Sequence, residues 1–99
     1  MINSVKKLKQ VIDKRDSIMT EHCKGESWAE LCNYPEERFW YTKNVSPLDE
    51  KIVDIANAVI VKFSIPCKNV KTVAEVYSNE WIYKLIFEDK EKQEEELSI

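Results

Sequence analysis

The sequence contains a single glycine, Gly25, among its 99 residues, whereas glycine makes up about 7% of an average protein. Hairpins and barrels use glycine where a turn needs a positive φ angle, so a chain with almost none is more typical of helices. A glycine-rich loop that binds phosphate is excluded for the same reason.

Long hydrophobic runs are also missing. The longest uninterrupted apolar stretch covers residues 58–61, far short of the ~20 residues that a membrane-spanning helix needs. The lysines near the N-terminus are not followed by an apolar segment, so this end does not resemble a signal peptide. We therefore expect a cytoplasmic protein without a membrane partner.

Residues that bind metals or act as nucleophiles are few. The three cysteines, Cys23, Cys32 and Cys67, are widely spaced and form no C-x-x-C motif, so we expect reduced, buried thiols. The only histidine, His22, directly precedes Cys23, and neighbouring residues on a helix diverge by about 100°. This pair fits neither a zinc site with two close ligand pairs nor a Cys–His catalytic pair. The sequence thus predicts no metal, no cofactor and no enzymatic activity.

The first clear pattern is an amphipathic helix from residue 4 to about residue 22, ended by Gly25. Arg15 falls within its apolar arc. We expect the stem of Arg15 to pack while its guanidinium reaches solvent, and a buried or interfacial ion pair is the alternative. The apolar arc consists of Val5, Leu8, Val11, Ile12, Ile18 and Met19.

Shorter elements follow. Ser27 and Glu30 have the spacing of a capping box, which predicts a short helix over residues 28–33. Pro35 suits the first position of another helical turn. The bulky residues 38–44 fit either an extended segment or the end of that helix, and we predict an extended segment.

The strongest helix start is at Ser46, a predicted cap, followed by Pro47. This helix should form the centre of the core and end before Pro66, because the residue before a proline avoids helical angles. Its apolar arc consists of Leu48, Ile52, Val53, Ile55, Ala56, Val59, Ile60 and Phe63.

Residues 70–88 fit two patterns. As helices they would place Val70, Val73, Ala74, Tyr77, Trp81 and Leu85 on one face, with a break near residues 78–79 and Asn79 as a cap. As a hairpin they would need a turn at residues 79–80, which lacks the glycine that such turns prefer. We therefore predict a mostly α, single-domain helical bundle of about four helices over residues 1–88. The alternative is an α+β fold with a C-terminal hairpin at 70–88, and residues 89–99 should form an acidic, solvated tail.

The net charge of −3 is unevenly distributed. Residues 1–24 carry six basic and three acidic side chains, and residues 88–99 carry six acidic and two basic ones. Lys6, Lys7 and Lys14 are the best candidates for contacts with nucleic acid. A helix-turn-helix at residues 72–87 is disfavoured, because its second helix would bring acidic residues to the phosphate backbone.

The aromatic cluster at residues 39–41 is the best candidate for a binding site. Arg38, Trp40 and Tyr41 are residue types that anchor protein interfaces, and Glu94, Glu95 and Glu96 could steer a basic partner. The leading hypothesis is a small non-enzymatic regulator, inhibitor or immunity-type protein that occludes a protein partner and is encoded by a phage or a mobile element. The alternatives are a nucleic-acid-binding transcriptional regulator that uses the first helix, and a structural homodimer.

Overall fold

The computed structural model describes residues 5–88, so the predicted acidic tail, including Glu94, Glu95 and Glu96, lies outside the described residues. The predicted mostly α fold is confirmed, and residues 5–88 contain no strand, which excludes the hairpin alternative. The elements are α1 (Val5–Cys23), α2 (Trp28–Leu31), α3 (Pro35–Asn44), α4 (Ser46–Lys62), α5 (Val73–Ser78), α6 (Glu80–Tyr83) and the π-helical turn η1 (Lys84–Glu88).

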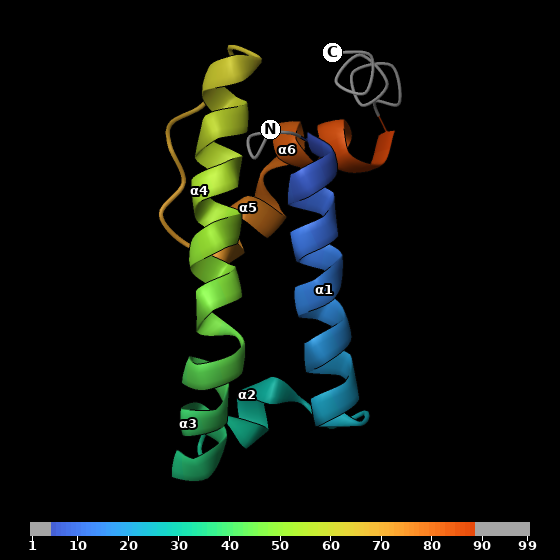
Figure 1. Ribbon diagram of the computed structural model, residues 1–99, viewed down its shortest axis with the longest axis vertical. Coiled ribbons are helices and arrows are strands. Elements are labelled where there is room, and N and C mark those ends of the chain that lie inside the picture. Colours follow the sequence, from blue (N-terminus) through green and yellow to red (C-terminus); the bar gives the residue numbers. More distant parts are fainter. Residues whose placement is uncertain (1–4, 89–99) are drawn as a thin grey trace.

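Two long helices, α1 and α4, lie side by side and run in opposite directions (Figure 1). The short helices α2 and α3 connect them at one end, and α5, α6 and η1 pack toward the other end. The hydrophobic core lies between α1, α4 and the C-terminal helices. It contains Val5, Leu8, Val11, Ile12, Ile52, Ile55, Ala56, Val59, Ile60, Val70, Val76, Ile82, Leu85 and Ile86.

Helix α1 ends as the sequence predicts. Lys24 and Gly25 both have positive φ angles, 48° and 88°, and the chain turns away there. A left-handed backbone at this position is costly for most residues but not for glycine, so the one glycine of the chain stands where the backbone needs it.

The prediction for residues 38–44 is wrong. They form most of α3, which begins with Pro35 at its first turn and has Glu36 and Glu37 next to it. Proline fixes a helical φ angle there, and acids in the first turn interact favourably with the helix dipole. These start signals outweigh the β propensity of the aromatic residues. The predicted short helix after Ser27 does form, as α2. The predicted capping box is wrong, because the side chain of Ser27 makes no capping hydrogen bond.

Helix α4 follows α3 after one residue. Val45 has φ −112° and ψ −42° and is fully buried, so the chain continues almost as one helix. Ser46 is therefore the first residue of α4 and not its cap, which corrects the prediction. Asn57 of α4 binds the returning chain: its Nδ2 donates to the carbonyl of Val70 (2.9 Å), and its Oδ1 accepts from the Val70 amide (2.7 Å).

The predicted break after Ser78 is confirmed, and Asn79 caps α6 by accepting a hydrogen bond from the amide of Ile82 at 3.1 Å. The predicted buried face is only partly correct. Tyr77 and Trp81 are 41% and 50% exposed, and the buried positions between residues 76 and 86 are Val76, Ile82, Leu85 and Ile86. The chain enters α6 through an extended residue at Asn79, so α5 and α6 are not one continuous helix and Trp81 does not follow the buried face of α5.

Candidate protein-binding surface

Arg15 is the centre of a polar network that joins four helices. Its Nε lies 2.5 Å from Oδ1 of Asp49 on α4, and its Nη2 donates to the hydroxyl of Tyr41 on α3 at 3.0 Å. The Tyr41 hydroxyl donates in turn to Asp49. The alternative prediction of a buried or interfacial ion pair for Arg15 is confirmed in its buried form, because Arg15 and Asp49 are only 14% and 18% exposed. The prediction that the guanidinium reaches solvent is wrong.

The same network fixes Tyr77 of α5. Nη1 of Arg15 lies 3.4 Å from the Tyr77 hydroxyl, and the guanidinium carbon lies 5.4 Å from the centre of the Tyr77 ring. The Tyr77 hydroxyl donates to Asp16 at 2.7 Å. Arginine is suited to this role because its planar group can form hydrogen bonds in its plane and contact an aromatic face.

The pKa shifts of Arg15, Tyr41 and Tyr77 keep these three groups protonated. Burial lowers the pKa of Arg15, but the hydrogen bonds to Tyr41 and Asp49 outweigh this, and the pKa is raised overall. Burial, followed by a hydrogen bond to a carboxylate, raises the pKa of both Tyr41 and Tyr77. At neutral pH the arginine is charged and both hydroxyls keep their protons, so the network holds the helices together with fixed charges.

A second cluster joins the C-terminal end of α1 to α2 and α3. The ring of His22 stacks on Trp40 with centroids 3.4 Å apart, and its Nε2 lies 2.5 Å from Oε2 of Glu37. Trp28 packs against Trp40 and Tyr41, with ring centroids 6.1 Å and 5.0 Å away. These contacts hold α2 and α3 against α1.

The predicted partner-binding residues of α3 differ in how far they are exposed to solvent. Arg38 is exposed and its Nη1 donates to the carbonyl of Cys32 at 2.9 Å. Trp40 and Tyr41 are half-buried and belong to the two clusters above. The neighbouring Phe39 is 71% exposed and points outward instead. A role of Arg38, Trp40 and Tyr41 in partner binding stays a prediction.

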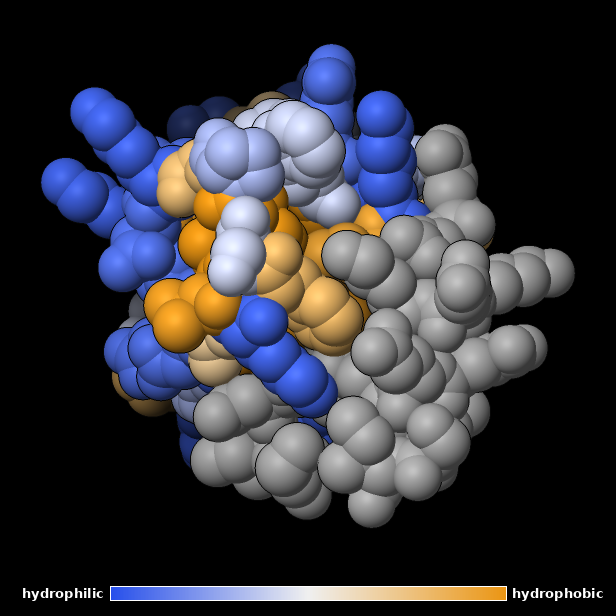
Figure 2. Space-filling view, turned by 90° about the horizontal axis from the view of Figure 1, so that it is seen from above, coloured by the Kyte–Doolittle hydropathy of each residue, from blue (hydrophilic) through white to orange (hydrophobic). Residues whose placement is uncertain are grey.

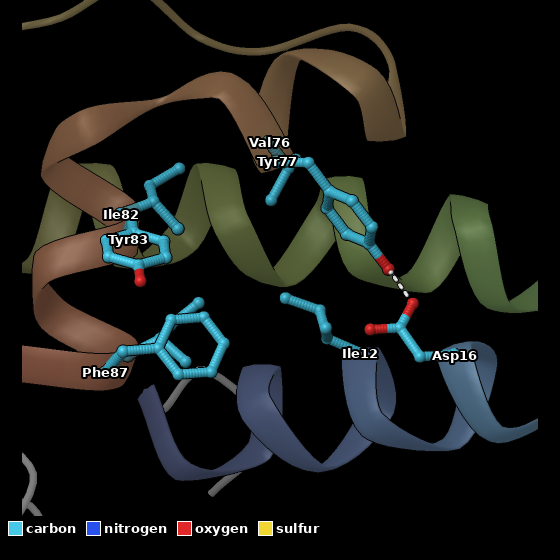
Figure 3. A pocket seen from close by; sticks show the side chains of 8 residues that line it. Ile12, Asp16, Val76, Tyr77, Ile82, Tyr83 and Phe87 are labelled. Atoms are coloured by element: carbon cyan, nitrogen blue, oxygen red, sulfur yellow. Dashed lines mark hydrogen bonds between the residues drawn. The ribbon is translucent and has the colours of Figure 1, made fainter.

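The structure reveals an aromatic surface on the C-terminal helices that the sequence did not indicate. Tyr77, Tyr83 and Phe87 are 41%, 50% and 46% exposed, and they surround a recess of about 160 Å³ between these helices and α1. Figure 3 shows the rings of Tyr83 and Phe87 across from Ile12, and Tyr77 bound to Asp16. We call this site the aromatic recess; its lining is completed by Ile12, Asp16, Val76, Ile82 and Ile86.

A second apolar hollow, of about 210 Å³, lies near the end of α4 and is lined in part by Phe63, Ile65, Trp81 and Leu85. Figure 2 views the molecule from this end and shows hydrophobic side chains gathered between hydrophilic ones. In the aromatic recess, by contrast, the aromatic rings lie next to a carboxylate that is 52% exposed, that of Asp16.

Of the predicted nucleic-acid contacts, Lys6 and Lys14 are exposed on α1 and Lys7 is half-buried.

The three cysteines are free thiols, as predicted, but their side chains are only half-buried, whereas the prediction was that they are buried. Within residues 5–88, His, Cys, Asp and Glu side chains form no group that could hold a metal ion. In the same part of the chain, no helix combines the length and hydrophobicity needed to cross a membrane.

No known protein family, curated protein or solved structure matches this chain. A function can therefore be inferred only from the fold and from the surface described above.

Proposed function

We propose that this chain is a small non-enzymatic regulator or inhibitor that binds a protein partner through the aromatic recess. One observation carries this proposal: three aromatic rings, each between 41% and 50% exposed, surround a concave apolar surface. Binding here would occlude the surface of the partner that enters the recess.

The exposed rings are suited to an interface for two reasons. Tyrosine and phenylalanine bury much area on binding and have few rotatable bonds, and aromatic residues are enriched in protein interfaces. Tyr77 is also held by Arg15 and Asp16 before any partner arrives. A surface that is ordered in advance loses less conformational entropy on binding.

The volume of the recess fits one large side chain of a partner. At about 160 Å³ it is close to an engineered cavity of about 150 Å³ in another protein, which binds benzene. A phenylalanine or leucine side chain would fill it, and such an anchor in a pocket is typical of the centre of an interface.

The lining of the recess supports binding without chemistry. Among residues 5–88, Asp16 is the only charged residue that lines the recess, and its Oδ1 already accepts from Tyr77. The raised pKa of Tyr77 keeps its hydroxyl protonated, so it is a poor base at neutral pH. We therefore propose a function in which the partner is occupied and not modified.

The test is affinity capture with the tagged full-length chain from cells that produce it naturally. We expect a protein to be captured by the wild type and by Phe39→Ala, and to be lost with Tyr83→Ala. Both substitutions remove an exposed aromatic ring, but Phe39 lies on α3 and does not line the recess. The captured protein is then purified and its affinity for the three chains is measured by calorimetry.

Thermal unfolding of both variants is the control for folding, and we expect each to unfold within a few degrees of the wild type. Equal affinity of the wild type and Tyr83→Ala for every captured protein would refute the proposed surface. Loss of capture with Phe39→Ala alone would move the interface to α3, next to Arg38 and Trp40.

A further inference from the structure

The charges beside the aromatic recess define the kind of partner that fits it. We infer that the recess binds a basic amphipathic helix of the partner, with one large apolar side chain in the recess and lysines or arginines beside it. This inference rests on the proposed function and adds the chemical class of the ligand.

The recess is the middle of three adjoining hollows. Asp16 lines both the aromatic recess and a shallow hollow along α1, while Tyr77 and Tyr83 line both the recess and a hollow beside α6. Together they form a continuous track that crosses from α1 to α6. An extended or helical segment of a partner could therefore contact all three at once.

Acidic side chains dominate this track. The hollow along α1 contains Asp13, Asp16 and Glu21, and the hollow beside α6 contains Glu80 together with one base, Lys84. Four acids and one base give the lining a net charge of −3 (1 − 4). The Asp16 carboxylate also lies 3.7 Å from Nη1 of Arg15, so the attraction for a ligand comes mainly from the exposed acids Asp13 and Glu21. Basic groups of a ligand would be attracted to the α1 side of the recess, because clustered charges of one sign act over about 10 Å at moderate salt.

The opposite end of the recess has a different charge. The ammonium group of Lys9 lies 5.8 Å from the centre of the Phe87 ring, so a positive charge already occupies this end. The track therefore carries exposed acids, Asp13 and Glu21, in the hollow along α1 and a positive charge beside Phe87. This polarity would orient a ligand with its own bases toward Asp13 and Glu21.

The same charges disfavour two other occupants. Nucleic acid would bring phosphates against Asp13, Asp16 and Glu21. A second copy of the chain, docked by twofold symmetry, would place the same acids of both copies in one interface. A basic helix would bring positive charges to these acids and would not be repelled by them.

The test uses the full-length chain and two labelled peptides of about 16 residues, long enough for a few helical turns. One peptide has a phenylalanine between leucines on one face and lysines on the other, and its twin has glutamate at each lysine position. Fluorescence anisotropy measures both affinities at low and at physiological salt. We expect the lysine peptide to bind at least about tenfold more tightly than its twin, and the difference to shrink as salt is added.

Two matched substitutions then locate the effect. Asp13→Lys replaces an attractive charge on the track with a repulsive one and should weaken binding of the lysine peptide by about fivefold or more. Asp54→Lys changes the net charge equally, but Asp54 is exposed on α4 and does not line the track, so little change is expected. Tyr83→Ala should weaken binding by removing a wall of the recess.

Three results would overturn the inference: equal binding of the two peptides, equal effects of Asp13→Lys and Asp54→Lys, or a dimer in sedimentation that Tyr83→Ala abolishes. Any of them, found together with Tyr83-dependent capture of a cellular protein, would leave the proposed function standing. A cellular partner that binds Tyr83→Ala as well as the wild type would instead refute the proposed function, whatever the peptides do.

Discussion

Replacing Arg15 with methionine should reveal how much the polar network contributes to the fold. Methionine keeps an unbranched, flexible stem that can pack where the arginine stem packs, but it removes the guanidinium. The change therefore breaks the bonds to Asp49 (2.5 Å) and Tyr41 (3.0 Å) while it preserves most of the apolar contact.

The expected loss of stability follows from the burial of the pair. The side chains of Arg15 and Asp49 are only 14% and 18% exposed, so water compensates poorly for the lost bonds. Hydrogen bonds to charged groups contribute about 1.5–3 kcal/mol, and breaking a fully buried pair costs about 3–5 kcal/mol. Because this pair is partly exposed and Tyr41 still donates to Asp49, we expect a loss of about 2–3 kcal/mol. For a domain of this size, that lowers the melting temperature by about 10 °C or more.

The measurement is urea unfolding followed by far-UV circular dichroism, for Arg15→Met, Asp49→Asn and the double variant. The double-mutant cycle should give a coupling free energy of about 1–2 kcal/mol, because the two side chains contact each other directly. Lys14→Met is the matched control: it removes a base from the same helix, but Lys14 is exposed, so its effect should stay within about 0.5 kcal/mol.

An Arg15→Met variant within about 0.5 kcal/mol of the wild type, or a coupling free energy near zero, would refute this reasoning. Such a result would mean that Arg15 exchanges freely with solvent. Tyr77 would then have no fixed partner at the aromatic recess other than Asp16.

Three further predictions concern single side chains. Asn57→Ala removes both hydrogen bonds to the backbone of Val70 and should cost about 1.5–3 kcal/mol in urea unfolding, whereas Asn69→Ala, at an exposed site on the same connection, should cost less than about 0.5 kcal/mol. Asn79→Ala removes the cap of α6 and should cost about 1 kcal/mol; an unchanged urea midpoint would contradict the capping role. Burial and then its bond to a carboxylate raise the pKa of Tyr77, so its contribution to stability is complete below about pH 10 and is lost as pH rises through the folded-state pKa. The urea midpoint should therefore fall less steeply above about pH 10 in Tyr77→Phe than in the wild type, and identical slopes would contradict this assignment.

The buried faces of α1 and α4 could be predicted because hydrophobic burial itself sets the pattern. Leu8 and Ile12 repeat at helical spacing on α1, as Ile52 and Ala56 do on α4, and all four are buried. Periodicity records which side of a helix avoids water, and this property is local to each element. The helix–break–helix of residues 73–83 was predictable for a similar reason, since Asn79 caps α6 with its own side chain.

The partners of polar residues could not be predicted in this way. The position of Arg15 inside an apolar arc indicated a special environment, but the sequence could not select Asp49, which is 34 residues away. The choice depends on which faces of α1, α3 and α4 meet after the chain turns at Gly25 and Val45. Tyr41 joins the network only because residues 38–44 are helical, so the wrong prediction of an extended segment also concealed this contact.

The aromatic recess depends on a change of helical phase. A continuous helix through residues 73–85 would place Tyr77 and Trp81 on the same face as the buried Leu85, which is the pattern that the sequence suggests. The extended residue at Asn79 interrupts that helix, and Ile82 and Ile86 enter the core in place of these rings. Within residues 5–88 the fully buried core is thus aliphatic, with Phe63 packed against it, and Tyr77, Tyr83 and Phe87 are left half exposed. Exposed apolar patches are typical of interaction surfaces, and for this reason we propose that a partner covers the aromatic recess.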